Sequence, residues 1–318
     1  MSDSKKKPLI SELITYLRSP RSDVEHREVW YIKIFNTLRL WSLGFVIGIV
    51  AVLIGNYFLE QTGYDHDEFA ITQLFEEVSV VTFLLMILVW APISEEIAFR
   101  FGLRFSPFRL GTQITGLIFF SLLHFEVDLI PQFIFEDIGS WGEILVLGSF
   151  FVFGVILISI FLNIHLVKKR VERVFRKYFA FIFYILAIIF AILHMGNYQD
   201  NWLELWYLAP LLVMPQFLLA LIASFLRMYY GFIWAVIVHG LNNGIIGVLL
   251  VFLMPFIELE EIAYKVDEAE LVQHLSVADF LSIITGSFFF MGIALLVLIC
   301  ITSLVYEYLV SNKRDRVK

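Results

Sequence analysis

The chain alternates long apolar runs with short polar segments, and most runs are close to 20 residues long. A helix needs about 20 mainly apolar residues to cross the roughly 30 Å hydrocarbon core of a bilayer. Strand-like alternation of apolar and polar residues is missing, so the pattern predicts an all-α, polytopic membrane bundle rather than a barrel. Eight transmembrane helices are expected, at residues 39–60, 76–99, 110–128, 144–167, 177–195, 205–226, 230–254 and 280–309.

Composition agrees with a membrane-embedded chain. Of its 318 residues, 59% are hydrophobic and 17% are charged, and the mean hydropathy is +0.82. A soluble domain carries about 25% charged residues. The polar N-terminal stretch has no apolar run before about residue 40, so no cleavable signal peptide is expected. Cys300 is the single cysteine and can form neither an internal disulfide nor a cysteine-based metal site.

Positive and negative charges are sorted between alternate loops. All 23 Lys and Arg residues except Lys265 fall in segments that alternate with acidic ones. The positive-inside rule therefore predicts that both termini are cytoplasmic, which requires an even number of crossings. We expect a cytoplasmic N-terminal segment at 1–38, a transmembrane bundle at 39–309 and a cytoplasmic tail at 310–318. Because positive charge covers only one side, nothing indicates a nucleic-acid partner.

Three polar motifs interrupt the apolar runs, and the first contains Glu95, Glu96 and Arg100. Charge at membrane depth is costly and is rarely kept without a function. On a helix Glu96 and Arg100 share one face, while Glu95 points about 100° away. One carboxylate held by an arginine and another left free would provide a general base inside a membrane. The alternative interpretation is a charge cluster at the cytoplasmic end of the span.

The second motif, Phe-x-x-x-His, occurs twice, as Phe120 to His124 and as Phe190 to His194. In each copy the two rings share a helix face. A neutral imidazole can act as a base, an acid, an oxyanion donor or a metal ligand. Alone, a histidine near the end of a span is more often an interfacial or packing residue.

The third motif contains His239 and Asn243, which again share a helix face. His239 lies about 18 Å along the helix from Arg227, deep enough to need a polar partner. Gly240 and Gly244 form a small-xxx-small pair that would let another helix approach closely, so helix packing is the alternative interpretation. Together the motifs offer a carboxylate, imidazoles and an amide, which can activate water and stabilise an oxyanion for amide hydrolysis.

In this order the motifs resemble those of the CPBP family, which comprises the type II CAAX prenyl endopeptidases and their bacterial relatives and is also called the Abi family. The resemblance covers about residues 80–250 and is carried by Glu95-Glu96-x-x-x-Arg100, Phe-x-x-x-His and His239-x-x-x-Asn243.

The resemblance implies a helical intramembrane protease in which Glu95 activates the attacking water, assisted by the histidine of the second motif. It also implies that His239 and Asn243 hold the oxyanion of the tetrahedral intermediate. Glu96 and Arg100 would orient and support Glu95.

Two histidines fit the second motif. His194 precedes His239 by 45 residues, and the residues after it look like those of bacterial members, so His194 is preferred. His124 follows the first motif at a spacing that also resembles some members, and it stays the alternative. Depth does not separate them, because each lies more than about 20 Å along its helix from the nearest basic residue.

No cofactor is expected, although zinc is an alternative. Glu95, His194 and His239 would be its ligands. The chain lacks the His-Glu-x-x-His pattern, in which two histidines on adjacent turns bind the metal, so a glutamate-dependent mechanism is favoured. The partners implied are a membrane-associated peptide or protein substrate and the lipid bilayer.

Two other functions fit the same residues. A proton-coupled transporter would use the carboxylates and imidazoles as a relay, but it is expected to show inverted repeats and broken helices, which the sequence does not reveal. A non-catalytic membrane scaffold or immunity factor would keep the fold without cleaving anything. The resemblance to bacterial members implies the bacterial inner (cell) membrane as the location.

Overall fold

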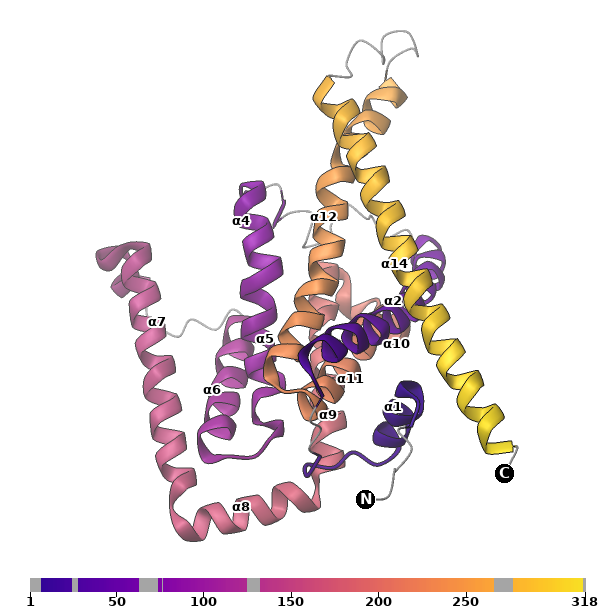
Figure 1. Ribbon diagram of the computed structural model, residues 1–318. Coiled ribbons are helices and arrows are strands. Elements are labelled where there is room, and N and C mark those ends of the chain that lie inside the picture. Colours follow the sequence, from indigo (N-terminus) through magenta and orange to yellow (C-terminus); the bar gives the residue numbers. More distant parts are fainter. Residues whose placement is uncertain are drawn as a thin grey trace.

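The chain forms a helical bundle, which confirms the predicted all-α fold (Figure 1). The computed structural model describes residues 7–24, 28–62, 74–75, 77–124, 132–265 and 277–316, and none of these residues is in a β-strand. The longer helices are α1 (Leu9–Arg18), α2 (Trp30–Glu60), α5 (Ala91–Phe99), α6 (Pro107–His124), α7 (Gln132–Asn163), α8 (His165–Lys177), α9 (Phe179–Leu193), α11 (Met214–Tyr229), α12 (Phe232–Lys265) and α14 (Val277–Arg316).

Six helices within the described residues are long and apolar enough to span a membrane, and a bent pair raises the number to seven. These seven correspond to seven of the eight predicted runs, and they are compatible with an integral membrane protein. The run predicted at 110–128 corresponds to α6, which is not among them, so the count of eight is not established. This helix carries three buried polar side chains, Thr112, Gln113 and Thr115, which lower its hydropathy.

The bent pair consists of α10 (Ala209–Leu212) and α11, with the preceding short turn Trp206–Leu208, and the two parts meet at 48°. Both helices have a proline in their first turn, Pro210 and Pro215. Proline suits a helix start but cannot continue a helix, because it lacks the N–H that would bond four residues back. The sequence therefore breaks this span at a defined point.

The N-terminal segment, predicted to be a polar lead-in, contains a helix that docks on the bundle. Leu9, Leu13 and Tyr16 of α1 are buried. The ring of Tyr16 makes edge contacts with Phe183, at 5.7 Å between centroids, and with rings of α11. Burial raises the pKa of the Tyr16 hydroxyl. Figure 1 places α1, the basic helix α8 and the end of α14 at the same end of the bundle.

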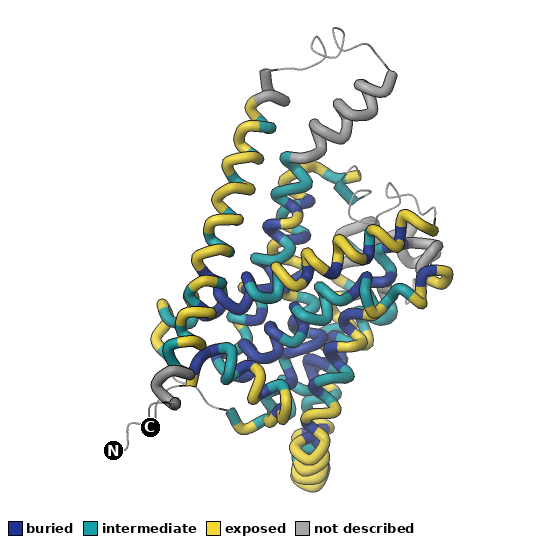
Figure 2. Tube along the Cα trace, turned by 90° about the vertical axis from the view of Figure 1, so that its right-hand side faces the viewer, coloured by how far each residue is buried: buried dark blue, intermediate teal, exposed yellow. Residues whose placement is uncertain are grey.

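The buried core lies where α2, α5, α9, α11 and α12 meet, as the dark blue central region of Figure 2 shows. Large rings fill it, including the fully buried side chains of Phe99, Phe183, Phe190 and Phe225. The outer faces of the long helices expose apolar side chains, as expected where lipid is the solvent.

Helix α12 approaches the second span very closely, as the two glycines predicted. A Cβ atom at Gly240 would lie 2.8 Å from the carbonyl oxygen of Leu88, and one at Gly244 would meet the Leu88 side chain. Pro92 lacks the N–H that would otherwise bond Leu88 O, and the helix forms a π-helical turn at Met86–Trp90 just before it. This contact sets α12 against α5, where the first motif lies.

Candidate active site

The first motif forms a buried ion pair at the end of α5. Nη1 of Arg100 lies 2.7 Å from Oε1 of Glu96, and the two side chains are 1% and 0% exposed. The pairing at a spacing of four residues confirms the prediction from helical geometry. One polar atom on each partner, Nη2 of the arginine and Oε2 of the glutamate, finds no hydrogen-bond partner among the described residues. Removing either charge would therefore leave the other buried and poorly compensated.

The third motif reaches the same carboxylate from α12. Nδ1 of His239 lies 2.9 Å from Oε1 of Glu96, and the ring is 1% exposed. Since Glu96 is an ion-pair partner of Arg100, its ionised oxygen accepts from both groups. The carboxylate thus fixes the orientation of the imidazole, in the way a second carboxylate or carbonyl fixes a functional histidine elsewhere.

Glu95 faces two imidazoles. Its Oε2 atom lies 3.7 Å from Nε2 of His239 and 3.9 Å from Nε2 of His194. These distances are too long for direct hydrogen bonds. Oε2 is buried and has no hydrogen-bond partner in the described part of the chain, although the side chain as a whole is 13% exposed. A buried polar atom of this kind is normally satisfied by water, and a water bonded to Oε2 would be within reach of both Nε2 atoms.

The partner of each Nδ1 atom determines whether the Nε2 atom of the same ring donates or accepts a hydrogen bond. Nδ1 of His194 lies 2.7 Å from the carbonyl oxygen of Phe190, one turn back on α9. A carbonyl only accepts, so Nδ1 of His194 donates and, in the neutral ring, Nε2 is an acceptor. His239 differs, because its Nδ1 contacts a carboxylate oxygen of Glu96 instead of a backbone carbonyl.

Phe190 contacts three charged or titratable residues of the cluster, Arg100, His194 and His239. The guanidinium carbon of Arg100 lies 3.9 Å from its ring centroid, a cation–π contact. Its ring meets those of His194, at 4.7 Å, and His239, at 5.7 Å. The phenylalanine of the second motif therefore positions the residues of all three motifs.

For the peptide hydrolysis that the resemblance implies, we expect Phe190→Leu to lower the turnover number about tenfold without changing KM, because the guanidinium and both rings lose the surface that orients them. The matched control is Phe183→Leu, two turns earlier on α9, which removes an equally buried ring that does not touch Arg100. Both variants should lower the unfolding temperature similarly. Equal loss of turnover in both would show that Phe190 acts through core packing alone.

Two residues that support the site were not identified from the sequence. Arg227, for which no role in the site was predicted, is 3% exposed and donates to the carbonyl oxygens of Arg100 and Phe101 at 3.1 and 2.7 Å. Gln113 of α6 accepts from the backbone N–H of Gly102 at 2.6 Å. An arginine that bonds carbonyls at the C-terminal end of a helix is a known pattern, but here 126 residues separate the partners.

The other predicted site residues are placed as follows. Asn243 lies one turn beyond His239 on α12 and is half-buried. His124 is the last residue of α6, and its side chain lies outside the described residues. The structure thus brings Glu95, Glu96, Arg100, His194 and His239 together, whereas the catalytic roles of all seven residues stay predictions.

Comparisons with known proteins return nothing: a scan against protein-family models and searches of curated proteins and solved structures give no match. The fold and site define a class, a polytopic helical membrane protein with a buried carboxylate–imidazole cluster. The resemblance to the CPBP family stays a prediction from the three motifs.

The cluster offers one carboxylate oxygen and two imidazole nitrogens, a donor set found in catalytic zinc sites. Tetrahedral zinc with ligands at about 2.0–2.1 Å would place the ligand atoms roughly 3.4 Å apart, closer than the 3.7 and 3.9 Å observed. Within the described residues, no group of three or more His, Cys, Asp or Glu side chains is arranged to hold a metal ion. Metal independence stays a prediction.

Proposed function

We propose that this chain is an intramembrane endopeptidase that hydrolyses a peptide bond of a membrane-associated protein with water activated by Glu95. The observation that carries the proposal is the position of the buried Oε2 atom of Glu95, which has no hydrogen-bond partner among the described residues and lies opposite the Nε2 atoms of His194 and His239. A carboxylate base, an imidazole acceptor and a cationic donor around one water site are what amide hydrolysis needs.

In this mechanism the water donates one hydrogen to Glu95 and the other to Nε2 of His194. Glu95 takes the first proton as the water oxygen attacks the scissile carbonyl carbon. The tetrahedral intermediate carries its negative charge on the former carbonyl oxygen. When the carbon–nitrogen bond breaks, the protonated Glu95 returns the proton to the leaving amine, which restores the carboxylate.

The two histidines take different roles because their Nδ1 partners differ. Two carboxylates and one guanidinium leave the buried cluster with one net negative charge, which one proton on an imidazole would neutralise. His239, held by a carboxylate, is the better cation, and its Nε2–H donates to the oxyanion. His194, held by a carbonyl, stays neutral and accepts from the water. Asn243 supplies the second oxyanion donor from the next turn of α12.

The membrane setting supports the same proposal. The basic helix α8, α1 and the end of α14 lie at one end of the bundle, which is the cytoplasmic end by the positive-inside rule. Substrate would reach the cluster from the bilayer or from its surface. The mechanism needs no cofactor.

The proposal is tested with the full chain reconstituted into liposomes together with membrane proteins extracted from the expression host. New protein N-termini should appear within or beside membrane segments, and the matching C-terminal carboxylates should gain one ¹⁸O atom when the reaction is run in H₂¹⁸O. Liposomes without the chain are the control. Absence of new termini, together with solute flux through the liposomes, would favour a transporter.

A further inference from the structure

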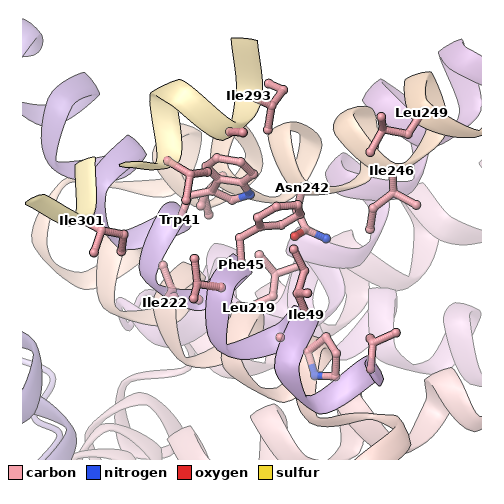
Figure 3. A pocket seen from close by; sticks show the side chains of 18 of the residues that line it. Trp41, Phe45, Ile49, Leu219, Ile222, Asn242, Ile246, Leu249, Ile293 and Ile301 are labelled. Atoms are coloured by element: carbon pink, nitrogen blue, oxygen red, sulfur yellow. The ribbon is translucent and has the colours of Figure 1, made fainter. Parts of the chain in front are cut away.

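A large apolar groove runs along α12, where Asn242 and Ile246 are among the residues that line it (Figure 3). Its volume is about 870 Å³, and α2, α11, α12 and α14 form its walls. Several lining side chains are exposed, among them Leu53 at 65% and Leu298 at 63%, so the groove opens outward from the bundle. In a membrane it faces the acyl chains.

One buried polar group in the groove wall, the indole N–H of Trp41, lacks a hydrogen-bond partner among the described residues. Trp41 is 2% exposed, and its indole Nε1–H has no hydrogen-bond partner among the described residues. Tryptophan N–H groups usually find a partner when they are buried, and leaving one unpaired costs free energy. Figure 3 shows the indole among the lining side chains. The groove is therefore mainly apolar, and its polar groups are the indole N–H of Trp41 and the side-chain amides of Gln216 and Asn242.

The length of the groove matches one leaflet. From Trp41 to Leu53 the lining of α2 extends about 18 Å at 1.5 Å per residue. Half of the hydrocarbon core of a bilayer is about 15 Å. Arg39, two residues before Trp41, is ion-paired with Glu307 of α14, which marks the polar end of the groove. The apolar part beyond Trp41 is therefore long enough to hold an acyl chain that spans one leaflet.

We propose that the groove binds one membrane glycerolipid, whose ester carbonyl accepts from Trp41 Nε1–H and whose acyl chain follows α2 toward Leu53. A transmembrane helix, from a substrate or from a second copy of the chain, fits less well, because its backbone carbonyl oxygens already accept hydrogen bonds within the helix, whereas an ester carbonyl in hydrocarbon has no donor of its own. The volume is within the roughly 300–1,000 Å³ of sites that hold a single small ligand. The proposal does not depend on the proposed peptidase activity.

The test is native mass spectrometry of the delipidated, full-length protein titrated with 1-palmitoyl-2-oleoyl phosphatidylglycerol. One lipid should bind with distinctly higher affinity than those that follow. Trp41→Phe keeps the ring but removes the donor, and it should weaken that first binding about three- to tenfold, the equivalent of one hydrogen bond.

Filling the groove gives the second arm. Ile49 lines it and is 43% exposed, while Ile47, also on α2 and 45% exposed, does not line it. Ile49→Trp should abolish the high-affinity lipid, and Ile47→Trp, the matched control, should leave it unchanged. Equal binding in these two variants, or wild-type affinity in Trp41→Phe, would overturn the proposal.

Gln216 is the competing polar anchor for a lipid in the groove. It lines the groove, and its Oε1 atom is unpaired among the described residues. Its side-chain amide has both an acceptor oxygen and a donor nitrogen, so it could also bond an ester carbonyl. If the ester carbonyl bonds Trp41, Gln216→Leu should keep the high-affinity lipid. A loss in Gln216→Leu with none in Trp41→Phe would show that Gln216 anchors the ligand, and would refute the assignment of Trp41 to the ester carbonyl.

Discussion

Glu95→Gln is expected to lower the turnover number for peptide hydrolysis by about 10³-fold while the protein still folds and inserts. A positioned general base contributes roughly 10²- to 10⁴-fold, and glutamine fills the same space without accepting a proton. Stability should hardly change, because Oε2 of Glu95 makes no hydrogen bond within the described residues. The measurement is the rate of cleavage of a peptide that spans a mapped cleavage site, together with the unfolding temperature in detergent.

The matched control is Ser94→Ala on the same turn of α5. The Ser94 hydroxyl bonds the carbonyl oxygens of Trp90 and Ala91, at 2.9 and 3.1 Å, and does not face the imidazoles. Its removal should leave the rate within about twofold of the wild type. A Glu95→Gln protein that cleaves at more than a tenth of the wild-type rate would refute the role of Glu95 as the base.

The membrane-spanning architecture was largely predictable, because hydropathy over a 20-residue window reflects a single dominant cost, that of placing polar groups in hydrocarbon. The helical pairing of Glu96 with Arg100 was predictable for a similar reason, since a spacing of four residues fixes which side chains meet. The glycines at 240 and 244 likewise predicted the close approach of α12. These features depend on local geometry.

Features that depend on tertiary packing were not predictable in the same way. The sequence offered two histidines at similar depths, and the contact that brings His194 within 3.9 Å of Glu95 depends on Phe99 of α5 packing against Phe190 of α9 at 5.3 Å. No local pattern encodes that contact. The sharing of one Glu96 oxygen between Arg100 and His239 spans 143 residues and was equally hidden.

The count of eight membrane crossings is the part of the predicted architecture that stays unconfirmed. Residues 110–128 are apolar enough to suggest a span, yet α6 has Gln113 turned inward to hold the end of α5 through Gly102. A buried polar side chain lowers the hydropathy of a helix without exposing it to water. Hydropathy therefore reflects the composition of a helix, whereas its packing determines which of its faces contacts lipid.

Arg100→Leu and Glu96→Leu are each expected to lower the free energy of unfolding by about 3–5 kcal/mol, the cost of leaving one charge of a buried pair without its partner. The double variant should recover most of that loss, because two apolar side chains can replace a buried ion pair at little cost. The measurement is thermal unfolding of the three purified variants in detergent. Additive losses in the double variant would show that the two residues do not act as a pair.

The same double variant separates stability from catalysis. Without Glu96 the His239 ring loses the acceptor that holds its Nδ1 atom at 2.9 Å, so neither its orientation nor its positive charge is maintained. Activity should therefore remain at least about 10²-fold below the wild type even where folding is restored. If activity returned together with stability, the ion pair would be only a structural support. If stability returns without activity, Glu96 is needed to orient His239 as well as to pair with Arg100. The buried ion pair would then serve the proposed reaction rather than the stability of the fold.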